Sequence, residues 1–182
     1  MSKIPGSLPR VMSCALGAAA LGADNDVLVD TALDVATDTL VTVFDGQPDV
    51  ARNVTVKGND ANVTGDVDVI GINNGGEIIN ETIALNGTTL VAGNKAFKTL
   101  TGITLPPYDT ADTERVRVGL GAKLGLPVAL SRNTVLAAFL DNLREGTEPT
   151  VTVDPSALEN NTATLNSALD GSAVIVDLYE TL

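Results

Sequence analysis

Short runs of β-forming residues recur along this chain and constrain its fold more than any other feature. Between residues 40 and 121, seven such runs alternate with residues that favour turns. Runs this short and closely spaced predict strands, because helices need longer stretches with apolar residues three or four apart. The runs are LVTVFD (40–45), ARNVTVKG (51–58), DVDVIGI (66–72), EIINETIAL (77–85), TTLVAG (88–93), FKTLTGITL (97–105) and ERVRVGLG (114–121). The sequence therefore predicts an all-β fold.

Several of these runs alternate apolar and polar residues. Val54 and Val56 alternate with Thr55 and Lys57, and residues 115–118 repeat the pattern with arginine and valine. In a strand, successive side chains point to opposite faces of the sheet. We therefore expect these strands to have one packed face and one face in water.

The residues between the runs tolerate the backbone conformations that turns require. Asn86-Gly87 is the strongest hairpin signal among them. The other turn signals are Asp45-Gly46, Asn59-Asp60, Asn73-Asn74-Gly75-Gly76 and Gly93-Asn94. Short strands separated in this way predict a jelly roll or Greek-key β-sandwich, or a barrel, and the spacing does not choose between them.

One segment after the strand runs favours a helix. In TVLAAFLDNLR (134–144), Val135, Ala138, Phe139 and Leu143 recur at helical spacing, and Glu145-Gly146 follows as a stop signal. We expect a short helix near 134–144 that caps one end of a sheet. Strand patterns return in 149–154 and 172–180. Residues 27–182 are therefore predicted to form one domain.

The first 26 residues differ in composition from the rest. They are rich in Ala and Gly and poor in β-branched residues. An extended arm of this kind can lie flat across a neighbouring subunit, because short side chains allow close backbone approach and lose little entropy on ordering. We predict that residues 1–26 form such an N-terminal arm, and the alternative is a strand or helix of the same domain.

The run from Val11 to Ala23 also has the length of a signal-peptide core, and Lys3 and Arg10 precede it. Gly17 and Gly22 interrupt the run, so the prediction of an uncleaved arm is preferred here. With 13 residues it falls short of the roughly 20 that a membrane-spanning helix needs. The sequence therefore predicts no transmembrane anchor.

Composition excludes several classes of partner. The formal net charge is −12, so most of the surface would repel a nucleic-acid backbone. Aromatic residues make up 3% of the chain and tryptophan is absent, which leaves the core to Val, Leu, Ile and Ala. An apolar fraction of 44% nevertheless predicts a folded protein.

The sequence offers little material for catalysis. It contains no histidine, which removes the Ser-His-Asp and Cys-His arrangements and histidine metal ligands. Its one cysteine, Cys14, has no neighbouring base and is interpreted as a small apolar filler. Gly119-Leu120-Gly121 begins like a dinucleotide-binding motif, but the third glycine is missing and the context is a strand. We predict no catalytic, cofactor-binding or metal-binding residues and no enzymatic activity.

Carboxylate pairs are the remaining chemical candidates. Asp66 and Asp68, or Asp24 and Asp26, could share a face of a strand and bind calcium or serve a glycosidase. Such pairs also arise by chance in a chain with 23 acidic residues. The loop within 59–68 lacks the spacing of the twelve-residue calcium motif, so the solvated strand face is the preferred interpretation.

Five triplets match the acceptor pattern for N-linked glycosylation. In a chain this rich in Asn and Thr they are interpreted as compositional. They begin at Asn53, Asn62, Asn80, Asn86 and Asn160.

The stretch from Gly46 to Leu126 resembles small structural proteins encoded near the capsid genes of tailed bacteriophages. The segments that carry the resemblance are GQPDVARNVTVKG (46–58), GDVDVIGINNGGEIINETIALNGTT (65–89), KAFKTLTGITLP (95–106) and VGLGAKLGLP (118–127). The segment VTVDPSALENNTATLNSALDGSAVIVDLY (151–179) is similar to the same group.

This resemblance implies a capsid decoration, or cement, protein of the virion. Such proteins are small, β-rich and often trimeric, and they clamp neighbouring capsomers from the outer capsid surface. The implied partners are the major capsid protein and further copies of this chain, with no nucleic acid, membrane or cofactor. The protein would be made in the host cytoplasm. The alternatives are a phage head-fibre or tail-associated β module, and a secreted bacterial adhesin or carbohydrate-binding β-sandwich.

Overall fold

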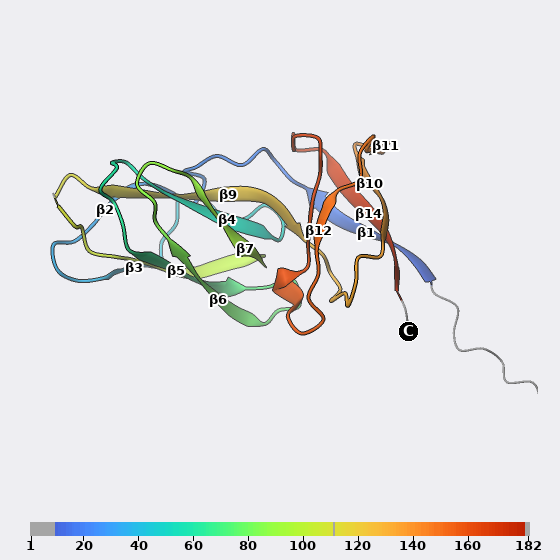
Figure 1. The fold of residues 1–182 in the computed structure, drawn as a ribbon, viewed down its shortest axis with the longest axis horizontal. Helices are drawn as coiled ribbons and strands as arrows, with labels where there is room; N and C mark the ends of the chain where they lie inside the picture. The colour runs from blue at the N-terminus through green and yellow to red at the C-terminus, as the bar shows by residue number, and fades with distance from the viewer. Residues whose placement is uncertain (1–9, 111, 181–182) are drawn as a thin grey trace, which may run out of the picture.

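The computed structural model describes residues 10–110 and 112–180, and nearly all of the regular secondary structure in these residues is β-strand (Figure 1). The strands are β1 (Arg10–Ala18), β2 (Leu28–Ala32), β3 (Thr39–Val41), β4 (Arg52–Gly58), β5 (Asp66–Ile72), β6 (Ile78–Ala84), β7 (Val91–Phe97), β8 (Thr99–Leu105), β9 (Arg115–Gly125), β10 (Val135–Leu140), β11 (Leu143–Arg144), β12 (Thr150–Thr152), β13 (Thr162–Thr164) and β14 (Ala173–Glu180). A single 3-10 turn, η1 (Leu158–Asn160), is the one helical element in the described part.

The strands form three antiparallel sheets. Sheet A has the order β1-β14-β10-β11 and sheet C the order β3-β8-β5-β6. Sheet B has the order β12-β13-β9-β4-β7, and β2 pairs with β9 beside it. Sheets B and C face one another across the larger apolar core, as in a β-sandwich. The predicted all-β sandwich is thus confirmed, while its jelly-roll or Greek-key connectivity stays a prediction.

Two apolar cores lie along the molecule. The larger core separates sheets B and C and is built mainly from Val, Leu and Ile, with Phe97 as its one fully buried aromatic residue. The smaller core lies beneath sheet A and includes Leu124 and Leu126 at the end of β9, together with Val174 and Val176 of β14. Strand β9 runs from the sandwich toward sheet A, which lies across the right-hand end of Figure 1.

The predicted alternation holds for some strands and fails for β4. In β9, Val116 and Val118 are fully buried while the two arginines between and before them are half-exposed, as predicted. In β4, by contrast, Arg52, Asn53 and Thr55 are also buried. The expectation of a wet face on β4 was wrong, because the segment 164–169 and the loop after β1 lie over that face.

The turn signals have different outcomes. Residues Asn73 to Gly76 connect β5 to β6 as a hairpin, in which the buried Asn73 side chain accepts hydrogen bonds from Gly75 N and Glu77 N. Asn86-Gly87 closes a tight turn with a bridge from Asn86 to Thr89. The strands on its two sides, β6 and β7, belong to different sheets, so this turn carries the chain across the sandwich.

The predicted helix near 134–144 was wrong. This segment forms β10 and β11, a hairpin whose turn residues Asp141 and Asn142 have φ of 51° and 61°. Two consecutive left-handed residues match the twist of paired strands and cannot continue a helix. Strand β10 also pairs with β14, a contact that lies far away in the sequence.

Part of the predicted arm forms a strand of the same fold. Strand β1 pairs with β14 from Arg10↔Glu180 to Ala18↔Ala173, with a bulge between Ala15 and Gly17. This is the alternative in which the segment is a strand of the domain. Residues 1–9 lie outside the described residues, and a contact with a neighbouring subunit stays a prediction. Within 10–110 and 112–180, no helix is long and apolar enough to cross a membrane.

A buried asparagine joins the segment after β9 to the loop before η1. The Asn161 side chain accepts from Leu130 N (2.8 Å) and Asp154 N (3.0 Å) and donates to the Asp154 carbonyl (2.7 Å). The Asp154 carboxylate in turn accepts from the Ser156 hydroxyl (2.6 Å) and the Asn160 side chain (2.8 Å). These hydrogen bonds lower the pKa of Asp154 to about 2.

Replacing Asn142 tests the hairpin. Asn142→Gly should leave the free energy of unfolding unchanged or raise it, whereas Asn142→Val should lower it by about 1–2 kcal/mol, because only glycine adopts positive φ freely. Urea denaturation of both variants measures the difference. In a helix the glycine would instead cost about 1 kcal/mol, so a destabilised Asn142→Gly would contradict the hairpin.

The Asp154 hydrogen bonds predict a dependence of stability on pH. Because the folded pKa lies below the unfolded value of about 3.9, the carboxylate contributes stability above that value and loses it as pH falls through about 2. Asp154→Asn should therefore be less stable than the parent protein at about pH 6, and the gap should close near pH 2. Urea midpoints at both pH values measure this. An equal gap at both would assign the effect to packing.

Candidate functional site

Three of the four carboxylates singled out in the sequence, Asp24, Asp26 and Asp68, make hydrogen bonds within the fold. Asp66 and Asp68 do lie on one exposed face of β5, as predicted, and Asp68 accepts a hydrogen bond from the Thr82 hydroxyl across the sheet. Asp24 binds Lys57 Nζ at 3.0 Å, and chiefly that hydrogen bond lowers its pKa. Asp26 accepts from Ala23 N. Among the described residues, no three His, Cys, Asp or Glu side chains are placed to hold a metal ion.

The remaining sequence candidates are also structural. Cys14 is buried beneath sheet A, and burial is the main cause of the raised pKa of its thiol. Gly119 lies on β9 where a Cβ would come within 1.9 Å of the Ala23 carbonyl oxygen, so close backbone approach accounts for this glycine. Of the five glycosylation triplets, the one at Asn53 is buried and inaccessible.

The two neighbours of β4 bulge at the same level, around Asn53. Between Arg52 and Val54 of β4, strand β9 carries two extra residues, and β7 carries two extra residues between the partners of Asn53 and Thr55. Such bulges leave backbone groups without ladder partners. The Asn53 side chain accepts from Lys123 N in β9 (2.9 Å) and donates to the Gly93 carbonyl in β7 (3.0 Å). One buried amide thus joins both bulges.

Other side chains complete the hydrogen bonds of the β7 bulge. The carboxylate of Glu81 on β6 accepts from Asn94 N (2.6 Å) and Lys95 N (3.2 Å). The ammonium of Lys123 donates to the Gly93 carbonyl (2.9 Å) and to Asn94 Oδ1 (2.7 Å). The bulges are therefore firmly held, as expected for features that shape a surface.

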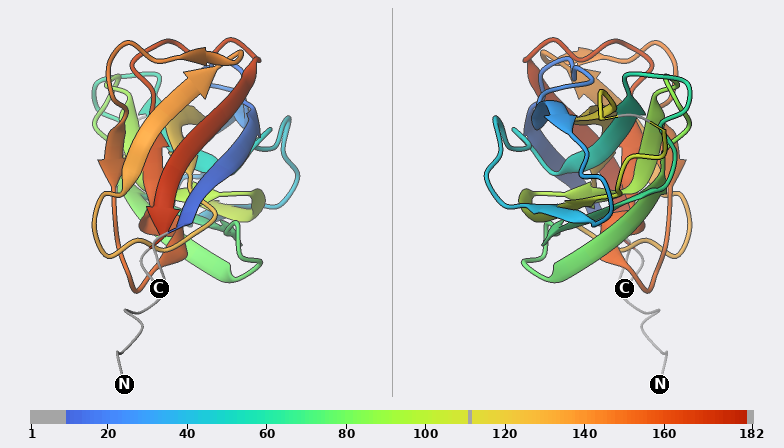
Figure 2. Two further views of the ribbon diagram at one scale, coloured as in Figure 1. Left: turned by 90° about the vertical axis from the view of Figure 1, so that its right-hand side faces the viewer. Right: turned by 90° about the vertical axis from the view of Figure 1, so that its left-hand side faces the viewer.

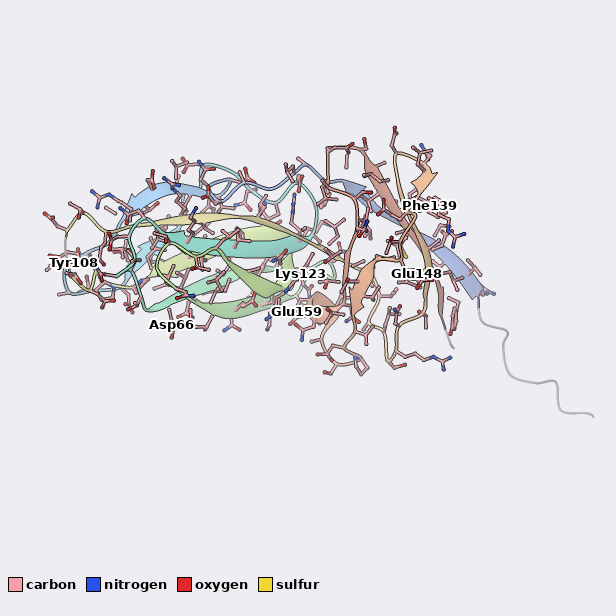
Figure 3. The ribbon with its side chains drawn as sticks, turned by 45° about the horizontal axis from the view of Figure 1, so that its top comes forward. Asp66, Tyr108, Lys123, Phe139, Glu148 and Glu159 are labelled. Carbon is pink, nitrogen blue, oxygen red and sulfur yellow. The ribbon has the colours of Figure 1, made fainter. Side chains whose placement is uncertain are left out.

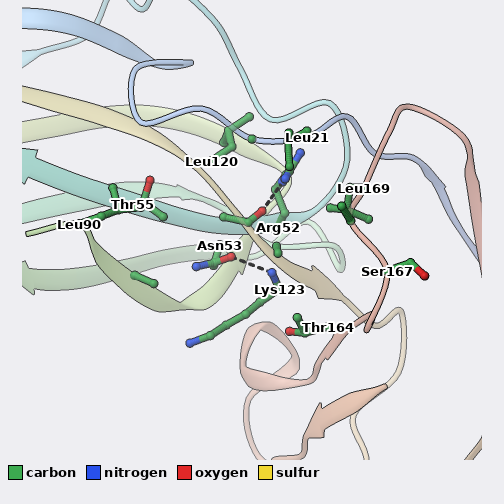
Figure 4. Close-up of a pocket in the computed structure, with 15 residues that line it drawn as sticks. Leu21, Arg52, Asn53, Thr55, Leu90, Leu120, Lys123, Thr164, Ser167 and Leu169 are labelled. Carbon is green, nitrogen blue, oxygen red and sulfur yellow. Dashed lines mark hydrogen bonds between the residues drawn. The ribbon is translucent and has the colours of Figure 1, made fainter. Parts of the chain in front are cut away.

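A cavity of about 430 Å³ opens beside these bulges (Figure 4). It lies between strands β4, β7 and β9, the loop after β1 and the segment 164–169. The apolar side chains around it include Leu21, Leu90, Leu120 and Leu169. Concave, mainly apolar pockets of this size with a few polar groups are typical of binding sites.

Arg52 is the buried charge of this cavity. Its side chain is 1% exposed and donates from Nε to the Gly121 carbonyl (2.7 Å) and from Nη1 to the Ala20 carbonyl (2.9 Å). The same Nη1 lies 3.1 Å from the Asp49 carboxylate, which offsets its charge. The Nη2 atom is buried and has no hydrogen-bond partner in the described part of the chain.

Thr55 supplies the second unpaired polar atom. Thr55 is 4% exposed, and its hydroxyl also has no partner among the residues described. The third such atom, the hydroxyl of Thr134, lies by a different depression. Of the three such atoms in residues 10–110 and 112–180, two thus belong to residues that line one cavity. No pattern in the sequence points to this site, since residues 51–58 look like an ordinary half-exposed strand.

The outer face of sheet A is a second candidate surface. Four apolar or aromatic side chains point outward from β1, β14 and β10, and alternate residues of β14 are buried beneath them. They are those of Val11, Ile175, Tyr179 and Phe139. Between them, the Ser13 hydroxyl donates to the Asp177 carboxylate at 2.5 Å. Arg132 lies over the Tyr179 ring, 5.8 Å from its centroid. Figure 2 shows this sheet face-on, and Figure 3 places Phe139 at that end, away from Asp66 and Tyr108.

Comparison with known proteins adds no relative. No protein-family model, no curated protein and no solved structure matches this chain.

Removing the Thr55 hydroxyl tests its unpaired state. Thr55→Val keeps the shape of the side chain and eliminates a buried polar atom, so we expect the free energy of unfolding to rise by about 1 kcal/mol. Urea denaturation of the isolated protein measures this. Thr101→Val is the control, because that exposed hydroxyl donates to the Ile70 carbonyl and its loss should not stabilise. A destabilised Thr55→Val would show that the hydroxyl has a partner.

Proposed function

We propose that this protein is a non-catalytic structural component of a phage virion, a decoration protein that associates with its own copies and binds the outer capsid. The observation that carries the self-association is the outer face of sheet A. That face presents the exposed Val11 (65% exposed) together with the half-buried Tyr179 and Phe139, and the Ser13–Asp177 pair between them is satisfied internally. An apolar, aromatic patch whose central polar pair is satisfied internally fits a protein interface.

The composition of the patch favours a second copy of the chain as its occupant. Two of the five aromatic residues of the chain, Phe139 and Tyr179, lie on this face. The edge strand β1 consists largely of small residues, so the backbone of another copy can approach it closely. Neither feature suits a soluble substrate. A closed ring of three copies would cover the patch on each copy.

The resemblance supports the capsid as the larger partner. The segments similar to virion structural proteins include strands β4, β5, β6 and β8 of the sandwich. A rigid sandwich with a self-associating sheet at one end suits a clamp that acts by binding energy alone. Many copies together turn modest individual contacts into strong reinforcement.

Sedimentation velocity on the purified protein, alone and mixed with capsids that lack it, tests this function. We expect trimers that sediment with the capsids. Val11→Glu and Phe139→Glu should weaken self-association by roughly 30-fold or more, because each places a charge in an apolar interface. Ile78→Glu is the control for Val11→Glu, since Ile78 is also an exposed apolar residue on a strand but lies on sheet C.

The outcomes separate the alternatives. Trimers that persist in both sheet A variants would show that the interface between copies lies on another surface. A monomer that ignores capsids would overturn the decoration function and favour the secreted adhesin or carbohydrate-binding sandwich.

A further inference from the structure

Three side chains from separate parts of the fold meet beside the turn between β5 and β6. They belong to Asn73 in that turn, Lys95 in the β7 bulge and Glu159 in η1. We infer that Lys95 forms a covalent amide bond with the side chain of Asn73, while Glu159 carries the protons and the Asn73 amide nitrogen leaves. The reaction takes place once in each chain, so it goes beyond the proposed function and does not depend on it.

One carboxylate contacts both nitrogen atoms that take part in the reaction. Glu159 Oε1 lies 3.5 Å from Lys95 Nζ, and Asn73 Nδ2 donates to Glu159 Oε2 at 3.3 Å. The Glu159 side chain is 11% exposed and Asn73 is fully buried. A carboxylate in contact with a nucleophile and with a leaving group can carry protons from one to the other. It also holds the amine near the amide, and such proximity lowers the barrier to reaction.

The carbonyl oxygen of the Asn73 side chain lies in an arrangement that favours attack on the amide. Asn73 Oδ1 accepts hydrogen bonds from Gly75 N (2.9 Å) and Glu77 N (3.0 Å). Attack on Cγ places negative charge on this oxygen, and two backbone N–H groups directed at it stabilise that charge. Asn73 Nδ2 also donates to Glu77 Oε2 at 3.0 Å, so the leaving nitrogen contacts two carboxylates.

The fold brings the amine and the amide together from two different sheets. Lys95 lies in the bulge of β7, where its backbone N–H donates to Glu81 at 3.2 Å, and η1 packs against β7 (Figure 1). Strand β7 is the edge strand of sheet B, and β6, which follows the Asn73 turn, is the edge strand of sheet C. A bond between Lys95 and Asn73 would therefore join the two sheets of the sandwich covalently.

The reaction balances without an oxidant or another reactant. Glu159 takes a proton from the Lys95 ammonium, and the neutral amine attacks Cγ of Asn73. A bond from Cγ to Nζ forms, and the bond from Cγ to Nδ2 breaks. Of the three hydrogens of the lysine ammonium, one stays on the new amide. The other two leave with Nδ2 and its own two hydrogens as an ammonium ion.

A second lysine–asparagine pair in the chain lacks the carboxylate. Lys123 Nζ donates to Asn94 Oδ1 at 2.7 Å. Glu81 accepts from the backbone N–H of Asn94, and no carboxylate in residues 10–110 and 112–180 binds the side-chain nitrogen of Asn94. This pair therefore has the nucleophile and the amide but no group to move the protons, and it provides a matched control.

Mass spectrometry of the full chain after denaturation tests the inference. We expect an intact mass below that of the sequence by one ammonia. Digestion with trypsin and a glutamate-specific protease cuts after Lys57, Glu77, Glu81 and Lys98, so the new bond would join the peptides 58–77 and 82–98. A succinimide at an Asn-Gly pair would also lose ammonia, but it would leave these two peptides separate.

Three variants separate the roles of the side chains. Lys95→Arg removes the nucleophile and Glu159→Gln removes the proton carrier, so both variants should keep the full mass and yield no joined peptides. Lys123→Arg is the control and should lose ammonia as the parent protein does. Circular dichroism spectra show whether each variant is folded.

Two results would overturn the inference. One is a parent protein that keeps the full mass of its sequence after prolonged incubation in the folded state. The other is joined peptides in the folded Glu159→Gln variant, which would show that this carboxylate does not carry the protons. Neither result bears on the proposed function, because sedimentation with capsids is measured independently of the bond.

Discussion

The pairing of Asn53 with both neighbours of β4 is the interaction on which the middle of the molecule depends. Its amide binds Lys123 N on one side and the Gly93 carbonyl on the other, and so compensates two bulges with one buried group. The bulges lie beside the cavity that Arg52 and Asn53 line. In a core with few aromatic residues, buried polar side chains fix the positions of neighbouring strands, because their hydrogen bonds have defined directions.

Local patterns account for what the sequence could predict. Strands β5 and β6 and the turn from Asn73 to Gly76 were predicted closely, because alternation and turn chemistry lie within a few residues of each other. The segment 134–144 was mistaken because its apolar spacing fits a helix, while its strand pairing with β14 is non-local. The adjacent residues Asp141 and Asn142 could have indicated a hairpin turn, since both residue types tolerate the positive φ that they adopt here.

The candidate site was hidden for the same reason. Arg52 and Thr55 sit in a run whose pattern indicates one wet face. That face is covered by the loop after β1 and by the segment 164–169, which lies more than a hundred residues later in the chain. For the carboxylates, the local arrangement could be predicted from the sequence, but the presence or absence of a site could not. Asp66 and Asp68 do share a strand face, yet the chemistry of a site needs a third ligand and enclosure, which spacing along a single strand cannot reveal.

The antiparallel register of β1 and β14 has a mechanical consequence. Arg10 lies opposite Glu180, so tension on these two ends would peel the strands apart one register pair at a time rather than shear the whole ladder at once. The sandwich, whose long strands β4 and β9 pair side by side along their length, would bear load through many hydrogen bonds together. In an assembly under internal pressure, this fold would therefore resist the load best if the force acted on the sandwich and not on the ends of β1 and β14.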